Sequence, residues 1–67
     1  MQITINNQSY TFDEHVSLEQ AVAQLQLEDT SGIALALNED IIPRSQWNDT
    51  ILSDEDKIII IGAVAGG

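Results

Sequence analysis

Four consecutive isoleucines, residues 58–61, restrict the fold of this chain more than any other feature of its sequence. Such a run is typical of a strand, and both faces of that strand are apolar. Either the strand lies at the centre of a sheet that is covered on both sides, or it leaves one apolar face open to solvent. With 67 residues, the chain is long enough for one domain with a small core, which this strand must help to form.

The first half of the chain predicts a hairpin and a helix. Residues 2–6 alternate apolar and polar side chains, as a half-buried strand does. A pair of asparagines then favours a tight turn into a return strand over 9–12. Ser17 begins a capping box, so a helix starts there, and its apolar stripe predicts an end near Gln26.

The second half predicts three strands. Residues 33–38 have apolar side chains on both faces, residues 41–42 form a short strand that Pro43 ends, and the isoleucine run lies in a strand over 57–62. Residues 44–47 are too few for a regular helix and predict a single tight turn. This order predicts an α+β domain over 1–67, a mixed sheet of four to five strands packed on one main helix. The β-grasp fold has this order, with its first and last strands as parallel neighbours at the sheet centre.

Acidity limits the partners of the chain. Eleven carboxylates against two basic residues give a formal net charge of -9, which repels nucleic acids and anionic membranes. No apolar stretch approaches the roughly 18–20 residues that cross a bilayer, and the first residues show no signal-peptide pattern, so we expect a cytoplasmic protein. The absence of cysteine excludes disulfides, thiolate metal sites and a cysteine nucleophile.

Groups that could catalyse a reaction are scarce. His15, the single histidine, lies in a predicted loop with no partner at ligand spacing and is interpreted as a solvated residue. Asp54-Glu55-Asp56 has carboxylates for a hard cation but lacks the spacing and the glycine of a calcium loop, so it predicts a solvated turn. The sequence has no nucleophile elbow and no glycine-rich phosphate loop. We therefore expect a chain that is not an enzyme, with no catalytic residue, no metal site and no cofactor of its own.

The chain ends in Ala65-Gly66-Gly67. Glycine has no Cβ, so this end can enter a narrow slot and adopt the backbone angles that the slot demands. The terminal carboxylate is ionised at neutral pH and can attack an electrophile such as the α-phosphorus of ATP. Residues 63–67 follow the predicted last strand and reach about 17 Å when extended. One interpretation is a frayed terminus; the other is a flexible tail that carries a carboxylate into the active site of another protein.

A set of residues in the second half of the chain forms a pattern together with this tail. It comprises Asn38, Ile41-Ile42-Pro43-Arg44, Trp47, Ile51-Leu52, Asp56 and Val64-Ala65-Gly66-Gly67. The pattern resembles the ThiS family, small sulfur carriers of thiamine thiazole synthesis with a ubiquitin-like β-grasp fold. In length and element order the resemblance covers nearly the whole chain. One departure is Glu55, where the family often has glycine; if that turn needs a positive φ, Glu55 costs about 1 kcal/mol.

The resemblance implies a function for the tail. A partner adenylyltransferase, similar to ThiF, uses Mg-ATP to activate the Gly67 carboxylate as an acyl-adenylate. A sulfur donor protein then replaces AMP and leaves a C-terminal thiocarboxylate, and a thiazole synthase, similar to ThiG, accepts the sulfur. Val64, Ala65, Gly66 and Gly67 would enter the partners, which supply every catalytic group.

A docking surface is also expected beside the tail. If Ile58 and Ile60 point towards the helix, Ile59 and Ile61 face outward, next to Ala34 and Ala36 on the neighbouring strand. Exposed apolar patches of this type often mark partner sites. The alternative is that loops cover this face.

Three other functions remain open. The small subunit of molybdopterin synthase has the same fold, tail and chemistry, but it is usually longer and often has prolines before its terminal residues. A ubiquitin-like modifier that is conjugated to proteins is a second alternative, which the short length disfavours. The third is a non-catalytic ubiquitin-like interaction domain with an idle tail.

Overall fold

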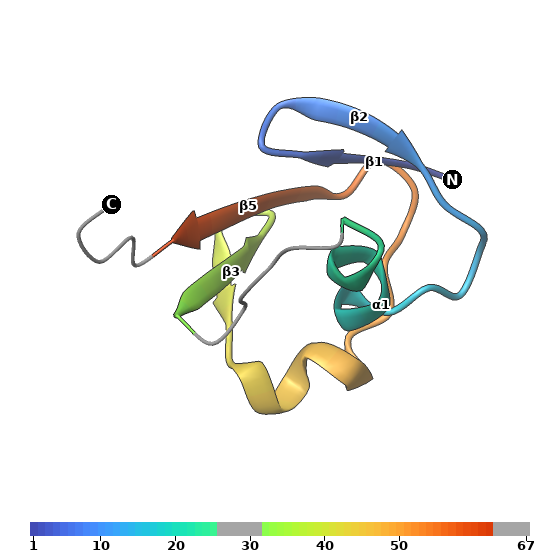
Figure 1. Cartoon of the computed structure of the whole chain (residues 1–67). Coiled ribbons are helices and arrows are strands. Elements are labelled where there is room, and N and C mark those ends of the chain that lie inside the picture. The colour runs from blue at the N-terminus through green and yellow to red at the C-terminus, as the bar shows by residue number, and fades with distance from the viewer. Residues whose placement is uncertain (26–31, 63–67) are drawn as a thin grey trace.

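The structure, a computed structural model, describes residues 1–25 and 32–62. A five-stranded mixed sheet in the order β2-β1-β5-β3-β4 forms one layer, and α1 and a 3-10 helix, η1, form the other (Figure 1). The elements are β1 (Gln2–Ile5), β2 (Gln8–Thr11), α1 (Leu18–Ala23), β3 (Ile33–Leu37), β4 (Asp40–Ile42), η1 (Arg44–Asp49) and β5 (Lys57–Gly62). The predicted α+β class, element order and β-grasp arrangement are confirmed. No helix of the described ranges has the length and apolar character needed to cross a membrane.

Two tight turns join the antiparallel pairs. Asn6 and Asn7 between β1 and β2 have φ angles of 50° and 69°, and Asn38 and Glu39 between β3 and β4 have 50° and 76°. Positive φ at both central residues is the geometry whose twist matches a two-residue hairpin, and asparagine tolerates it well. The turn at Asn6 and Asn7 was predicted from the sequence.

The capping box of α1 forms as predicted, but the helix is shorter than expected. The amide of Gln20 donates to Ser17 Oγ at 3.1 Å, and the amide of Ser17 donates to Gln20 Oε1 at 2.9 Å. At the other end, the amide of Leu25 donates to the carbonyl of Val22, a bond that spans three residues rather than four. This tighter last turn ends the α-helix at Ala23, so the predicted end near residue 26, which lies outside the described residues, was wrong.

The isoleucine run lies in the central strand, as predicted. β5 pairs in parallel with β1, where Ile58 lies beside Ile5, and antiparallel with β3. Ile58 and Leu35 are fully buried against the helical layer, whereas Ile61 is 46% exposed. Of the two alternatives for this strand, the second is therefore correct: helices cover one face of the sheet, and apolar side chains remain accessible on the other.

The segment after Pro43 is longer and more ordered than a single tight turn. The amide of Gln46 donates to the Pro43 carbonyl at 2.8 Å, and the resulting 3-10 pattern continues to Asp49. Trp47 of η1 is almost fully buried in the core, and its Nε1 donates to the Ile42 carbonyl at 2.9 Å. η1 therefore carries a large side chain that covers the core next to α1.

Replacing Glu55 with glycine is expected to raise the free energy of unfolding by about 0.5–1 kcal/mol. Glu55 has a φ of 69°, where a Cβ clashes with its own backbone, and relief of that clash outweighs the added entropy of the unfolded chain. Urea denaturation measures the change. Glu55→Ala keeps the Cβ and is the matched control, with no expected gain; equal stability of the two variants would contradict this account.

Candidate functional site

The accessible face of the sheet opposite α1 carries the predicted docking residues. Ile61 pairs with Ala34, and Ile59 pairs with Ala36, in the antiparallel register of β5 and β3. Because Ile58 is fully buried on the helical side, Ile59 and Ile61 face the other way. The neighbours expected from the sequence are therefore the observed ones.

One predicted member of this surface is less accessible than expected. Ala36 is only 7% exposed, because it lies between Ile59 on β5 and Ile41 on β4, and both isoleucine side chains are much larger than its methyl group. Ala36 therefore supports the surface from below and offers little area of its own. The prediction that it faces outward holds, but the prediction that it is open to a partner was wrong.

Ile41 is the member of this surface that sequence reasoning missed. It lies on the edge strand β4 and is 59% exposed, the highest value among the large apolar side chains of the described residues. The signal was present, because a two-residue turn at 38–39 places residue 41 opposite residue 36, on the same face. We name these five residues the outer apolar patch: Ala34, Ala36, Ile41, Ile59 and Ile61.

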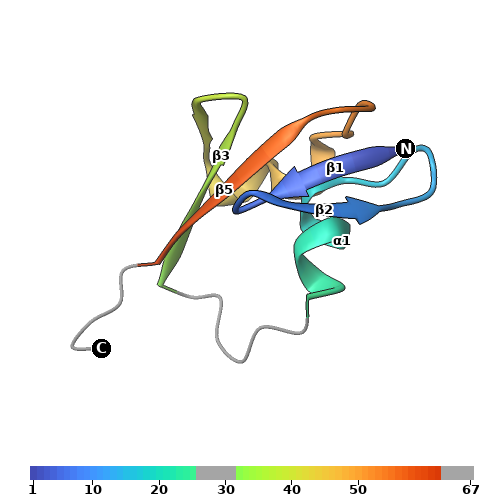
Figure 2. The same cartoon turned by 90° about the horizontal axis from the view of Figure 1, so that it is seen from above.

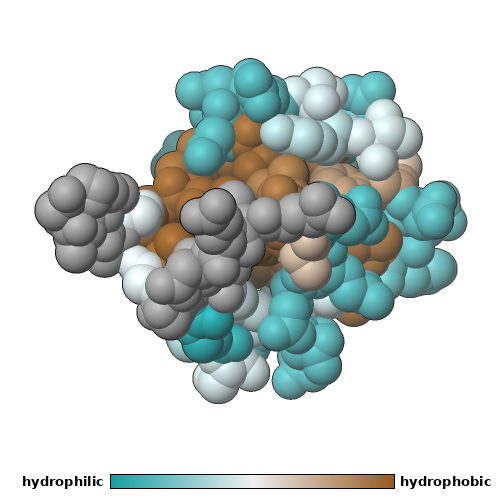
Figure 3. All heavy atoms as spheres, viewed as in Figure 1, coloured by the Kyte–Doolittle hydropathy of each residue, from teal (hydrophilic) through white to brown (hydrophobic). Residues whose placement is uncertain are grey.

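The patch covers only the half of this face that β5, β3 and β4 form. Figure 2 shows the strands of this face from above. Towards the other edge, β1 and β2 present Gln2, Thr4 and Ser9, and the Ser9 hydroxyl donates to Gln2 Oε1 at 2.9 Å. Figure 3 shows apolar side chains in the middle of the molecule that reach the surface next to the carboxyl end of β5. The face is therefore divided into an apolar half on β5, β3 and β4 and a polar half on β1 and β2.

The predicted tail, residues 63–67, follows β5 directly. β5 ends at Gly62, directly after Ile61 of the outer apolar patch, and residues 63–67 follow. The proposed tail residues Val64, Ala65, Gly66 and Gly67 lie outside the described residues. The covalent connection nevertheless fixes the start of the tail at the margin of the patch.

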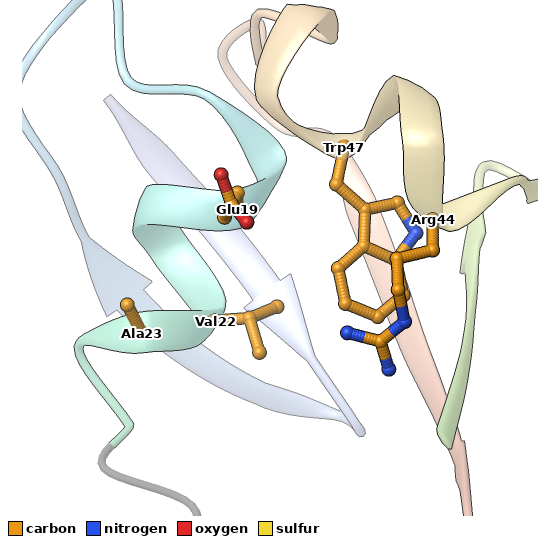
Figure 4. A pocket seen from close by; sticks show the side chains of 5 residues that line it. All are labelled: Glu19, Val22, Ala23, Arg44 and Trp47. Carbon is orange, nitrogen blue, oxygen red and sulfur yellow. The ribbon is translucent and has the colours of Figure 1, made fainter. Parts of the chain in front are cut away.

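A hollow lies between α1 and η1, and Figure 4 shows its side chains. It has a volume of about 150 Å³ and is lined by Glu19, Val22, Ala23, Arg44 and Trp47. The guanidinium carbon of Arg44 lies 4.3 Å from the centre of the Trp47 rings, which places the cation over the face of the indole. Because this contact covers the buried indole, it gives Arg44 and Trp47 a structural role.

The residues considered for metal binding, His15 and Asp54-Glu55-Asp56, do not form a metal-binding group among the residues that the structure describes. Over 1–25 and 32–62, no three histidine, aspartate or glutamate side chains gather in a way that could hold a metal ion. Two carboxylates of the 54–56 turn accept hydrogen bonds within the fold: Oδ1 of Asp54 accepts the amide of Gln2, and Asp56 accepts the Asn38 side chain and the Ser53 amide. These bonds fasten the turn to β1 and to the hairpin of β3 and β4.

Comparisons with known proteins agree with the topology. The model of the ThiS family matches residues 3–67. The sulfur carrier protein ThiS of Escherichia coli K12 is 36% identical over 67 residues, with full coverage of both chains, and an uncharacterized protein, ycf40, of Porphyra purpurea is 31% identical over 97% of this chain and 90% of its own. The crystal structure of the thiamine biosynthesis protein ThiS from Geobacter metallireducens superimposes with a TM-score of 0.84 over both whole chains at 22% identity, a likeness of fold. A family model that spans nearly the whole sequence, together with a full-length relative at this identity, shows that the chain belongs to the ThiS family.

Proposed function

We propose that this protein is a sulfur carrier in thiamine biosynthesis and that its reactive group is the carboxylate of Gly67. Membership of the ThiS family and the full-length likeness to a sulfur carrier of Escherichia coli support the pathway. The observation that carries the proposal is the junction at Gly62, where an exposed apolar patch on a rigid sheet meets a segment that ends in two glycines. The patch would hold the partner, and the segment would supply the reacting atom.

The chemistry needs only a carboxylate from this chain. A carboxylate oxygen of Gly67 attacks the α-phosphorus of ATP in the partner adenylyltransferase, and pyrophosphate leaves while magnesium neutralises its charge. Sulfur at the oxidation level of sulfide, from a sulfur donor protein, then attacks the acyl carbon, and AMP leaves. The product is a thiocarboxylate, whose sulfur is transferred to a thiazole synthase. Every acid, base and metal in this scheme belongs to a partner.

Mass spectrometry of the intact protein, purified after co-expression with an adenylyltransferase and a sulfur donor, tests this proposal. We expect a mass gain equal to the exchange of one oxygen for sulfur, located in the C-terminal peptide. An isopeptide bond between Gly67 and a lysine would indicate a protein modifier instead. A tail that is never modified would indicate an interaction domain.

The molybdopterin alternative predicts the same mass change and needs a separate test. The purified thiocarboxylate form is offered to a thiazole synthase and to the large subunit of a molybdopterin synthase. Our proposal expects sulfur loss only with the thiazole synthase. Transfer to the molybdopterin enzyme alone would assign the chain to that pathway.

Ile61→Lys is expected to weaken adenylyltransferase binding by about tenfold or more. A lysine buried in an apolar contact must lose its hydration without a partner, and buried contact residues can contribute more than about 1 kcal/mol. Isothermal titration calorimetry gives the affinity, and a thermal melt confirms that the variant is folded.

The chain provides a close control for this change. Ile51 is 54% exposed but lies in the segment that bridges to Ser17, away from the outer apolar patch. Ile51→Lys therefore adds the same charge and removes the same exposed side chain elsewhere, with little effect on affinity. If both variants bind equally well, the patch is not the docking surface.

A further inference from the structure

A polar hollow of about 370 Å³ lies at the beginning of β5, and its walls are Gln2, Thr4, Asp54 and Glu55. Ile3 and Ile5 of β1 are buried against the helical layer, so Gln2 and Thr4, which alternate with them, face the other side of the sheet. The hollow therefore opens on the same face as the outer apolar patch. It lies near the start of β5, whereas Ile61 and the start of the tail lie near its end.

We infer that this hollow receives a basic side chain, an arginine or lysine, of the partner protein that covers the outer apolar patch. This inference rests on the proposed function, because it assumes that the patch is a docking surface. The inference specifies two features of the partner's surface. An apolar area contacts the end of β5, and a cationic group contacts the start of β5.

Backbone hydrogen bonds preform the hollow. The amide of Gln2 donates to Asp54 Oδ1 at 2.7 Å, and the amide of Glu55 donates to the Gln2 carbonyl at 2.7 Å. The amide of Thr4 donates to the Asp56 carbonyl at 3.0 Å, so the loop continues the parallel pairing of β1 and β5. A partner would therefore bind a wall that is already ordered, which lowers the entropy cost of association.

The free atoms of the hollow are suited to a cation. In the described part of the chain, the Glu55 carboxylate and Oδ2 of Asp54 accept no hydrogen bond, while Oδ1 of Asp54 is held by Gln2. Lys57 lies beside Thr4 in the register, yet it neither lines the hollow nor forms an ion pair with Asp54 or Glu55 there. Two carboxylates with open lone pairs next to an amide and a hydroxyl match the several donors of a guanidinium or an ammonium group.

Charge and position together favour a partner protein over a second copy of this chain. With a net charge of -9, two copies repel each other, and Lys57 and Arg44 are the only basic residues that a second copy could offer. Arg44 already lies over Trp47 on the helical layer. A partner with a basic residue next to an apolar area would instead gain both contacts at once and be fixed in one orientation, with its tail-binding slot at the end of β5.

The test is the affinity of the adenylyltransferase for the variant Asp54→Asn/Glu55→Gln, measured by isothermal titration calorimetry. Both changes keep the shape of the side chains, and asparagine keeps the oxygen that accepts the Gln2 amide. We expect affinity to fall about tenfold at low salt and the difference to shrink as salt is raised. The control Glu19→Gln/Asp49→Asn removes the same charge from the helical layer, and its expected change is less than twofold.

The outcomes separate this inference from the proposed function. If the hollow variant and the charge control bind alike, while Ile61→Lys still weakens binding, the hollow does not receive a basic side chain and the patch remains the docking surface. If wild-type protein binds no adenylyltransferase, both proposals are wrong. A loss confined to the hollow variant, with an unchanged melting temperature, supports the inference.

Discussion

Addition of a single alanine after Gly67 is expected to lower adenylate and thiocarboxylate formation by about a hundredfold or more. The extra residue moves the carboxylate by about 3.4 Å along an extended tail and places a Cβ where glycine fits a narrow slot. A displacement of about 1 Å at a reacting atom already costs about a hundredfold in rate. Release of pyrophosphate by the partner adenylyltransferase measures the first step, and the mass of the intact protein measures the second.

The body of the protein serves as the internal control in that experiment. The added alanine follows the sheet by several residues, so the melting temperature and the affinity of the outer apolar patch for the adenylyltransferase should stay close to wild type. A variant that binds normally and reacts slowly would identify the position of the carboxylate as the cause. Activation at the wild-type rate would show that tail length does not position the reacting group.

Ile58→Ala is expected to lower the free energy of unfolding by about 2–5 kcal/mol, enough to unfold a large share of the molecules. Ile58 is fully buried in the central strand, next to Ile5 on one side and Leu37 on the other, so the loss of its side chain leaves a cavity. A domain of this size has a total stability of only about 3–10 kcal/mol. Urea denaturation followed by circular dichroism gives the change.

Ile61→Ala is the matched control for this substitution. It removes the same atoms from the same strand, but its side chain is 46% exposed and faces away from the helices, so the expected cost is below about 1 kcal/mol. Similar losses at the two positions would mean that the outer apolar patch contributes to the core as much as the covered face does. In that event the exposure of Ile61 would no longer support a docking role for the patch.

Local chemistry made much of the fold predictable. The turn residues at 6 and 7 and the capping box at Ser17 each act within a few residues, and the alternation of β1 fixes which face is buried. The helix end, the length of η1 and the burial of Ala36 were not predictable in this way. Ala36 is covered by Ile41 and Ile59, which belong to two different neighbouring strands, so its burial is decided by the register of the whole sheet.

The candidate site was predictable to a similar extent. The glycine tail and the outward isoleucines follow from the sequence and from the period of a strand. The polar hollow does not, because Gln2 and Asp54 are 52 positions apart and meet only once β1 and β5 pair. Nothing in the residues around either position indicates the other.

The parallel pairing of β1 and β5 has a mechanical consequence if another protein binds the proposed tail and pulls on it. A pull on the end of β5, resisted at the start of β1, loads the bonds between these strands in shear. The hydrogen bonds from the Thr4 amide to the Asp56 carbonyl and from the Asn6 amide to the Ile58 carbonyl then share the force. They must break together and cannot break one after another. A partner that binds the proposed tail would therefore apply force to it without separating β1 from β5.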